Sequence, residues 1–459
     1  RTCVQGTSPQ EFQAEILGVL NGVNPGVSVV LARFSGPLLE KTGIFEGMSG
    51  SPVFVEGKLL GAVAYSFAFS KEAIGGITPI TQMVEAFAES PGPGPGNRIL
   101  LDNGLPRKFG PAPQSGSGAS SSWTVPAAGG PRQPLLAAFG GRSLVPIATP
   151  LSVAGFHGET LREFGPRFRS MGLSLLQGAG TGGSAAGAQA GASDGAPLEA
   201  GSNIVVPLVR GDLEVSAGGT VTYVDGDRLY AFGHSMLQLG FTELPMHKAR
   251  AVTVVPSLES SFKILEIGSQ AGAIRQDRGV GIYGVVGAAP KMVPLRILLQ
   301  TSRGTAKEFR YELAHDPFLT PLLVNAAVYN TLTTFERAQG MVTLRVKGKI
   351  SVRNEQPVAI ENAYSADGDA PNAVSLAVAI PVNYLMAAGY ANLDLERIDL
   401  EITARESDQA ALLDSVRLPR TEVKAGESLD LEIASRKANG DLIRDTYPVR
   451  IPENASPGP

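Results

Sequence analysis

The most constraining feature of the sequence is a pair of short apolar segments joined by a tight turn. Pro52-Val53-Phe54-Val55 is followed by Glu56-Gly57-Lys58 and then by the apolar segment 59–65. Runs rich in β-branched and aromatic residues on either side of a glycine-containing turn predict an antiparallel β-hairpin. Pro52 suits the start of a strand, because proline has no amide hydrogen for an inner ladder position. The N-terminal part of the chain is therefore expected to form an antiparallel sheet.

The composition fits many further short strands. The chain has 459 residues, of which 55 are Gly and 33 are Pro, and only 18% are charged. Gly and Pro favour turns that interrupt strands, so a mainly β chain with several cores is expected. The net charge of −4 provides no basic field for a phosphate backbone, which excludes nucleic acid as an expected partner.

Cysteine content and hydropathy exclude other classes of protein. The single cysteine, Cys3, cannot form an intrachain disulfide framework or a cysteine-based zinc site, and we expect it to be structural. We find no run of about eighteen apolar residues, and therefore expect no transmembrane segment. The chain begins with Arg1, so we expect that any targeting segment is absent from it.

Composition and periodicity divide the chain into five parts, with the boundaries 1–90, 91–200, 201–310, 311–407 and 408–459. The first and third parts carry closely spaced short strands, as two halves of a β-barrel would. The second is rich in Gly, Pro, Ser and Ala around a small structured insert, which predicts linkers. The fourth combines a long helix with alternating strands and predicts an α+β element. The fifth predicts an immunoglobulin-like β-sandwich tail that ends as a truncated domain would.

The segment Gly47-Met48-Ser49-Gly50-Ser51-Pro52 directly precedes the hairpin. Acyl transfer needs a hydroxyl on a tight turn, with neighbouring backbone N–H groups directed at the developing oxyanion. Gly47 can adopt backbone angles that direct its own N–H and that of Ser49 inward, and Gly50 allows another chain to approach. We therefore interpret Ser49 as a nucleophile and the amides of Gly47 and Ser49 as an oxyanion hole. Taken alone, the segment also fits an ordinary turn between strands.

Residues 40–53 and 57–63 resemble the peptidase family of the stage IV sporulation protein B (SpoIVB), a branch of the trypsin-like superfamily. The resemblance recurs at residues 219–234 and 272–284, so that it covers about half of the chain in two blocks. It implies a chymotrypsin-like double β-barrel and a serine endopeptidase that works through an acyl-enzyme without a cofactor. It also implies a protein or peptide substrate and a bacterial protein exported to the periplasm or cell envelope.

The general base expected beside such a serine is a histidine, and the chain has four: His157, His234, His247 and His315. His234 follows an expected strand after a glycine and matches the Gly-His position of the family, so it is assigned as the base. His247 lies beside Lys248 and Arg250, which disfavour an imidazolium. For His157 and His315 we expect a role in local structure.

The order of these residues departs from the usual barrel, because Ser49 precedes His234. A circular permutation can explain this order, since catalytic triads are defined by geometry and not by position in the chain. The family has an aspartate shortly upstream of its serine, where this chain reads Arg33-Phe34-Ser35-Gly36. Asp277 is instead the expected orienting acid, at a separation from His234 close to that of the chymotrypsin template. A salt-bridged surface turn at Asp277, and a Ser–His dyad without an acid, are the alternatives.

The resemblance also locates the substrate groove. Tyr65 and Ser66 are expected to line it, and Gly43 and Ile44 to form the base of the specificity pocket, which favours small or apolar side chains. Two alternative functions fit the same residues: a non-catalytic cell-envelope scaffold built on a degenerate barrel, and a protein that cleaves only its own linkers. The sequence leaves the oligomeric state open and contains no metal-binding motif.

Overall fold

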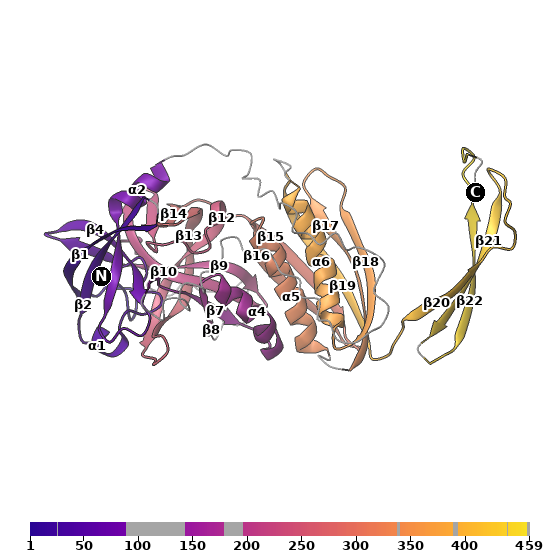
Figure 1. Ribbon diagram of the computed structural model, residues 1–459, viewed down its shortest axis with the longest axis horizontal. Coiled ribbons are helices and arrows are strands. Elements are labelled where there is room, and N and C mark those ends of the chain that lie inside the picture. Colours follow the sequence, from indigo (N-terminus) through magenta and orange to yellow (C-terminus); the bar gives the residue numbers. More distant parts are fainter. Residues whose placement is uncertain are drawn as a thin grey trace.

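The computed structural model describes residues 1–24, 26–88, 143–178, 196–336, 340–388, 393–437 and 439–456. The predicted linkers, 91–133 and most of 178–200, lie outside these residues. The described part is mainly β, as predicted, and is elongated, with the N-terminal sheet at one end and a small C-terminal sheet at the other (Figure 1).

The N-terminal sheet has the strand order β1-β2-β5-β4-β3. Strand β6 also pairs with β4, at residues 65–67, beyond the part that β3 covers. Its strands are β1 (Gln13–Asn24), β2 (Val27–Ser35), β3 (Pro52–Val55), β4 (Lys58–Phe67), β5 (Ile74–Pro79) and β6 (Leu144–Pro146), and two helices accompany it, α1 (Leu39–Thr42) and α2 (Ile80–Ala88). The predicted hairpin is confirmed, because β3 and β4 pair antiparallel across a turn in which Glu56 and Gly57 have positive φ angles of 50° and 78°.

Thirteen strands form the largest sheet in the described part of the chain, in the order β18-β17-β19-β15-β16-β9-β12-β13-β14-β11-β10-β7-β8. They are β7 (Thr149–Ala154), β8 (Leu173–Gln177), β9 (Asn203–Gly211), β10 (Glu214–Asp225), β11 (Arg228–Ala231), β12 (Gly240–Val255), β13 (Phe262–Arg278), β14 (Gly281–Val286), β15 (Met292–Gln300), β16 (Ala306–Ala314), β17 (Met341–Val352), β18 (Val358–Asp367) and β19 (Leu395–Arg405). Helix α4 (Gly158–Ser170) connects β7 to the parallel strand β8.

The α+β element takes in more of the chain than 311–407, because β15 pairs in parallel with β19 and antiparallel with β16. Helices α5 (Leu319–Phe335) and α6 (Ala370–Ala387) lie side by side against this part of the sheet (Figure 1). Helix α6 is long and apolar enough to cross a membrane by length and composition alone, so the absence of a transmembrane segment stays a prediction. Its buried Val374, Val378 and Val382 belong to the main apolar core. Packing in a protein core also requires apolar residues and so accounts for the same composition.

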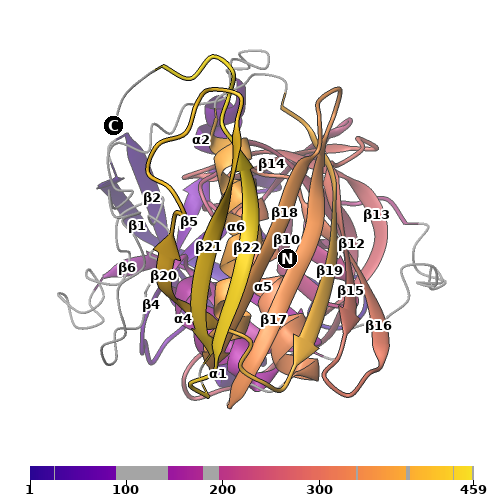
Figure 2. The ribbon, with the colours of Figure 1, turned by 90° about the vertical axis from the view of Figure 1, so that its right-hand side faces the viewer.

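The tail forms one antiparallel three-stranded sheet within residues 408–437 and 439–456. Its strands are β20 (Ala411–Arg417), β21 (Ser428–Lys437) and β22 (Leu442–Arg450). Figure 2 looks from the C-terminal end, with this sheet nearest the viewer. The immunoglobulin-like sandwich stays a prediction, because a sandwich needs a second sheet against the first.

The loop that contains Ser49 packs directly on β10 and the end of β11. Thr220 N–H donates to the Ser49 carbonyl at 2.9 Å, and the Thr222 hydroxyl donates to the Gly50 carbonyl at 2.8 Å. Gly50 has a φ of +93°, and a Cβ added there would lie 1.9 Å from the Thr220 oxygen and 2.6 Å from the Phe232 nitrogen. Only glycine allows this approach of three backbone segments, so Gly50 joins the N-terminal sheet to the large sheet.

We expect Gly50→Ala to lower the free energy of unfolding far more than Gly57→Ala. Both residues have positive φ, which costs an alanine about 1 kcal/mol, but a Cβ on Gly57 meets nothing within 4 Å. Urea denaturation of both variants measures the difference. Equal losses of stability would show that the Gly50 approach is not a tight packing constraint.

Candidate active site

Ser49 lies in the turn between α1 and β3. The turn is closed by hydrogen bonds from Met48 N–H to the Phe45 carbonyl (3.1 Å) and from Ser51 N–H to the Met48 carbonyl (3.0 Å). The Ser51 hydroxyl also donates to the Met48 carbonyl, at 2.5 Å. Ser49 itself is fully buried, and its Oγ makes no hydrogen bond with any described residue. A buried hydroxyl without a partner is costly, and such costs are typical of functional sites.

Two backbone amides flank this hydroxyl. Within the described residues, neither the Gly47 N–H nor the Ser49 N–H donates a hydrogen bond, whereas Met48 N–H is engaged by Phe45 and Gly50 N–H by Val63. Gly47 has a φ of +87°, which favours glycine. The amides predicted as oxyanion donors are therefore available to an acceptor.

His234 follows β11 in a tight turn. Phe232 and Gly233 have φ angles of +69° and +71°, and a positive φ is unusual for phenylalanine. The turn is fixed on the N-terminal sheet, because the Thr78 hydroxyl donates to the Gly233 carbonyl at 2.6 Å. A Cβ on Gly233 would lie 2.7 Å from the Ala62 Cβ, so the turn sits directly on β4.

The hydrogen bonding of His234 defines its tautomer. Its Nδ1 lies 2.8 Å from the Ser235 carbonyl oxygen, which can only accept, so Nδ1 carries the proton. In the neutral ring Nε2 then has the lone pair and can act as a base. The imidazole is 3% exposed.

One strand, β4, supports both segments. The Val63 carbonyl accepts from Gly50 N–H at 2.8 Å, while the neighbouring Ala62 and Ala64 contact Gly233. The Ser49 loop and the His234 turn, which are distant in sequence, are thus neighbours on one strand. Because Ser49 Oγ makes no hydrogen bond with described residues, it is not bonded to His234 in this conformation.

Asp277 is fully buried behind the loop that follows His234. Its carboxylate accepts from the backbone N–H groups of Met236 (2.8 Å), Leu237 (2.7 Å) and Leu239 (3.3 Å). Burial raises the pKa of the carboxyl to about 6, and these amides partly oppose the shift. The predicted acid therefore holds the loop beside the histidine, and the salt-bridged surface turn considered as its alternative is wrong.

Lys263 lies beneath the Ser49 loop and was not identified from the sequence. It is fully buried, and its Nζ donates to Thr2 Oγ1 at 2.9 Å and to Asn203 Oδ1 at 2.8 Å. Burial lowers the pKa of the ammonium to about 7. A Cβ on Gly47 would lie 3.1 Å from the Lys263 Cβ, so the lysine packs against the oxyanion loop. A lysine within the apolar start of a strand is the signal that could have drawn attention to it.

Of the residues predicted to bind substrate, Tyr65 and Ser66 lie in β4, and Gly43 and Ile44 lie in the loop after α1. The Ile44 side chain fills the space over Gly75, where an added Cβ would lie 2.3 Å from the Ile44 Cδ1, and Gly43 has a φ of +60° just before it. Tyr65 is 2% exposed and Ser66 half-buried, and both lie in the part of β4 that pairs with β6. The expected groove therefore already carries a strand of the same chain.

The remaining residues of interest serve local structure. His157 caps α4, because its Nδ1 accepts from Glu159 N–H at 3.4 Å. His315 is partly buried, and desolvation lowers its pKa. The thiol of Cys3 is buried and donates to the Thr7 carbonyl at 3.1 Å, as expected for a structural cysteine.

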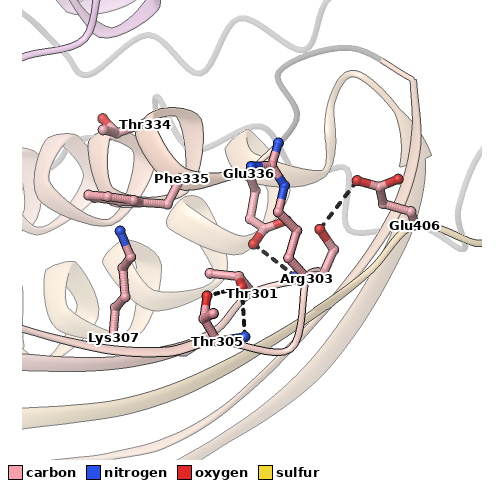
Figure 3. A pocket seen from close by; sticks show the side chains of 9 residues that line it. Thr301, Arg303, Thr305, Lys307, Thr334, Phe335, Glu336 and Glu406 are labelled. Atoms are coloured by element: carbon pink, nitrogen blue, oxygen red, sulfur yellow. Dashed lines mark hydrogen bonds between the residues drawn. The ribbon is translucent and has the colours of Figure 1, made fainter.

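A hollow between the β15–β16 turn and the end of α5 lies outside this site (Figure 3). Its polar groups pair with one another: Glu336 accepts from Ser302 N–H at 3.0 Å, and Glu406 accepts from the Ser302 hydroxyl at 3.3 Å. Lys307 Nζ lies 4.0 Å from the centroid of the Phe335 ring. None of its lining residues is a predicted catalytic residue.

Comparison with known proteins finds one match to a protein family. The model of the family described as SpoIVB peptidase S55 matches residues 1–84, which include the Ser49 loop and β1 to β5. No curated protein and no solved structure matches the chain significantly. The predicted resemblance is therefore confirmed for the N-terminal segment.

The buried Lys263 predicts a pH dependence of stability. Its pKa is about 7 in the folded protein and is ordinarily 10.5, so the unfolded chain binds more protons between these values. The free energy of unfolding should therefore gain a contribution as pH rises from about 7 to about 10.5. Subtracting the profile of Lys263→Met, measured by urea denaturation, isolates this contribution. Parallel profiles would show that Lys263 is not desolvated.

Proposed function

We propose, from the premise that residues 1–84 belong to the SpoIVB peptidase S55 family, that this protein is a serine endopeptidase with Ser49 as its nucleophile and His234 as its general base. The observation that carries the proposal is the support of both segments by β4. Gly50 N–H bonds to Val63, and Gly233 packs on Ala62 of the same strand. Two unrelated turns would need neither contact. A site assembled from the Ser49 loop and the His234 turn needs both.

The proposed reaction follows from the groups at the site. His234 Nε2 takes the proton of Ser49 Oγ as the oxygen attacks a peptide carbonyl carbon. The carbonyl oxygen becomes an oxyanion that accepts from the Gly47 and Ser49 N–H groups. The imidazolium then gives its proton to the leaving amine as the C–N bond breaks. Water, deprotonated by the same imidazole, hydrolyses the acyl-enzyme and restores Ser49.

Asp277 is assigned the role of a positioning residue in this reaction. Its bonds to the amides of Met236, Leu237 and Leu239 fix the loop that begins at His234. A negative charge behind the loop also favours the imidazolium that forms during proton transfer. The carboxylate thus orients His234 through the backbone of the following loop, whereas the acid of a catalytic triad contacts its histidine directly.

The wider assignments follow from the family. We propose that the N-terminal sheet and the β9–β14 part of the large sheet correspond to a circularly permuted double barrel, with the β-sandwich tail as an accessory domain. We also propose that the protein is exported to the bacterial cell envelope and acts there on protein or peptide substrates.

One observation favours the rival proposal, a non-catalytic envelope scaffold. Ser49 is fully buried and is not hydrogen-bonded to His234, so the site as it stands neither admits substrate nor activates the hydroxyl. The two proposals differ in whether the serine reacts with an electrophile.

A fluorophosphonate probe should label the wild-type protein at Ser49, because the probe requires an activated serine. Ser49→Ala should abolish labelling, and His234→Ala should slow it by on the order of 10² to 10⁴-fold. Ser51→Ala is the matched control, because this serine is buried in the same turn but bonds to Met48. Labelling is read by mass spectrometry of the intact protein and its peptides. A folded wild-type protein that stays unlabelled even after long exposure would support the scaffold.

Replacing Asp277 with Asn should misplace His234 and slow labelling by on the order of 10²-fold, because small displacements of a base are costly. The pH midpoint of labelling should fall, since the charge that favours the imidazolium is lost. Asp316→Asn is the control, because Asp316 is also buried and accepts from backbone N–H groups, at Phe318 and Leu319. An unchanged midpoint in Asp277→Asn would remove Asp277 from the mechanism.

The raised pKa of Asp277 also predicts an effect on stability. The folded protein binds this proton up to about pH 6, whereas the ordinary value is 3.8. The contribution of Asp277 to the free energy of unfolding should therefore decrease as pH rises from about 3.8 to about 6. Denaturation of the wild type and Asp277→Asn over this range measures it, and identical slopes would contradict the burial of a titrating carboxyl.

A further inference from the structure

Strand β6 adds to the N-terminal sheet from far along the chain. Its residues pair antiparallel with the end of β4, Tyr65 with Pro146, Ser66 with Val145 and Phe67 with Leu144. Strand β3 pairs only with the first part of β4, up to Ala62. The final residues of β4 therefore present an edge that β3 leaves open and β6 occupies.

The backbone contacts continue beyond β6. The N–H of Ile147 donates to the Ala64 carbonyl at 2.9 Å, which extends the pairing toward the Ser49 loop. An extended peptide that adds to a sheet edge gains its affinity from such main-chain bonds, and its alternate side chains enter pockets. Residues 144–147 have this form.

The side chain of Ile147 is buried in an apolar cluster. It is 3% exposed, whereas the preceding Pro146 is exposed. Ile147 belongs to the apolar cluster that includes Phe45 and Met48, the residues just before Ser49, and Val63 of β4. Ile147 is thus buried in the apolar cluster to which the Ser49 loop and β4 contribute.

The chain after Ile147 passes along the Ser49 loop. A Cβ on Gly47 would lie 3.4 Å from the Pro150 Cγ, so Pro150 rests on the oxyanion loop. Ile147 shares the apolar cluster of Phe45 and Met48, and Pro150 contacts the loop at Gly47. Ser49, in the same loop, is 0% exposed.

We propose that residues 144–147 occupy the substrate position of the site, with Ile147 in its primary specificity pocket. The proposal rests on the proposed peptidase function. It identifies the substrate class as extended peptides with a branched aliphatic side chain at the residue before the cleaved bond. It also explains the closed site, because the chain's own strand competes with substrate for β4.

The experiment compares the rates of fluorophosphonate labelling of the wild type, Ile147→Asp and Leu412→Asp. A carboxylate is disfavoured in an apolar pocket, so Ile147→Asp should release the strand and raise the rate by ~10-fold or more. Leu412→Asp makes the same kind of change at a side chain that is 78% exposed on β20, and should leave the rate unchanged. Circular dichroism and thermal unfolding check that each variant folds. If Ile147→Asp does not fold, Ile147→Ala, which only empties the pocket, replaces it.

A peptide added in trans provides the second readout. The blocked pentapeptide Ser-Leu-Val-Pro-Ile, a copy of residues 143–147, should slow the labelling of the released variant, and the same peptide with Asp in place of Ile should not. Cleavage of the wild-type chain after Ile147 that is absent in Ser49→Ala would also support the assignment.

Equal labelling of wild type and a folded Ile147 variant, with no effect of the peptide, would overturn it while leaving the peptidase intact. Absence of labelling in every folded protein would instead overturn the proposed function.

Discussion

The close backbone approach at Gly50 is the constraint on which the rest of the structure depends. At this point the Ser49 loop contacts Thr220 of β10 and the Phe232 nitrogen after β11, at distances that exclude any side chain. Gly219 has a related role, because a Cβ there would lie 2.2 Å from the Phe232 ring. Gly50 and Gly219 thus allow these segments to fit together, which explains why residues so distant in sequence are neighbours.

Buried polar groups then fix each half of the site. Lys263 lies under the oxyanion loop, and Asp277 lies behind the loop that follows His234. Burial favours the neutral form of each side chain: it lowers the pKa of Lys263 to about 7 and raises the pKa of Asp277 to about 6. Such groups cost free energy unless every hydrogen bond is made. They therefore contribute little to stability, but they fix the positions of the segments that they join. Both are placed where a small displacement would separate Ser49, the proposed nucleophile, from His234, its proposed base.

Local structure was largely predictable from the sequence, and contacts between distant segments were not. The hairpin at Gly57 and the long helix α5 follow from turn residues and from local helix-forming sequence, which act over a few residues. The Ser49 turn was identifiable for the same reason. By contrast, the hydrogen bonds of Asp277, the burial of Lys263 and the pairing of β6 depend on which strands become neighbours. Helix α6 shows the related difficulty that composition alone does not reveal what a helix packs against.

The site combines components that would each be ordinary alone: a tight turn, a histidine after a strand, two amides that donate to no described residue, and a strand that adds to a sheet edge. Their assembly on β4 is what distinguishes a peptidase from a scaffold.

The most direct measurement is a crystal structure of the protein after reaction with a fluorophosphonate. We predict a phosphonyl group on Ser49 whose oxygen accepts from the Gly47 and Ser49 N–H groups, with His234 Nε2 beside the serine oxygen. A modified Ser49 with the imidazole turned away on a separate lobe, or a phosphonyl group on another residue, would contradict this site.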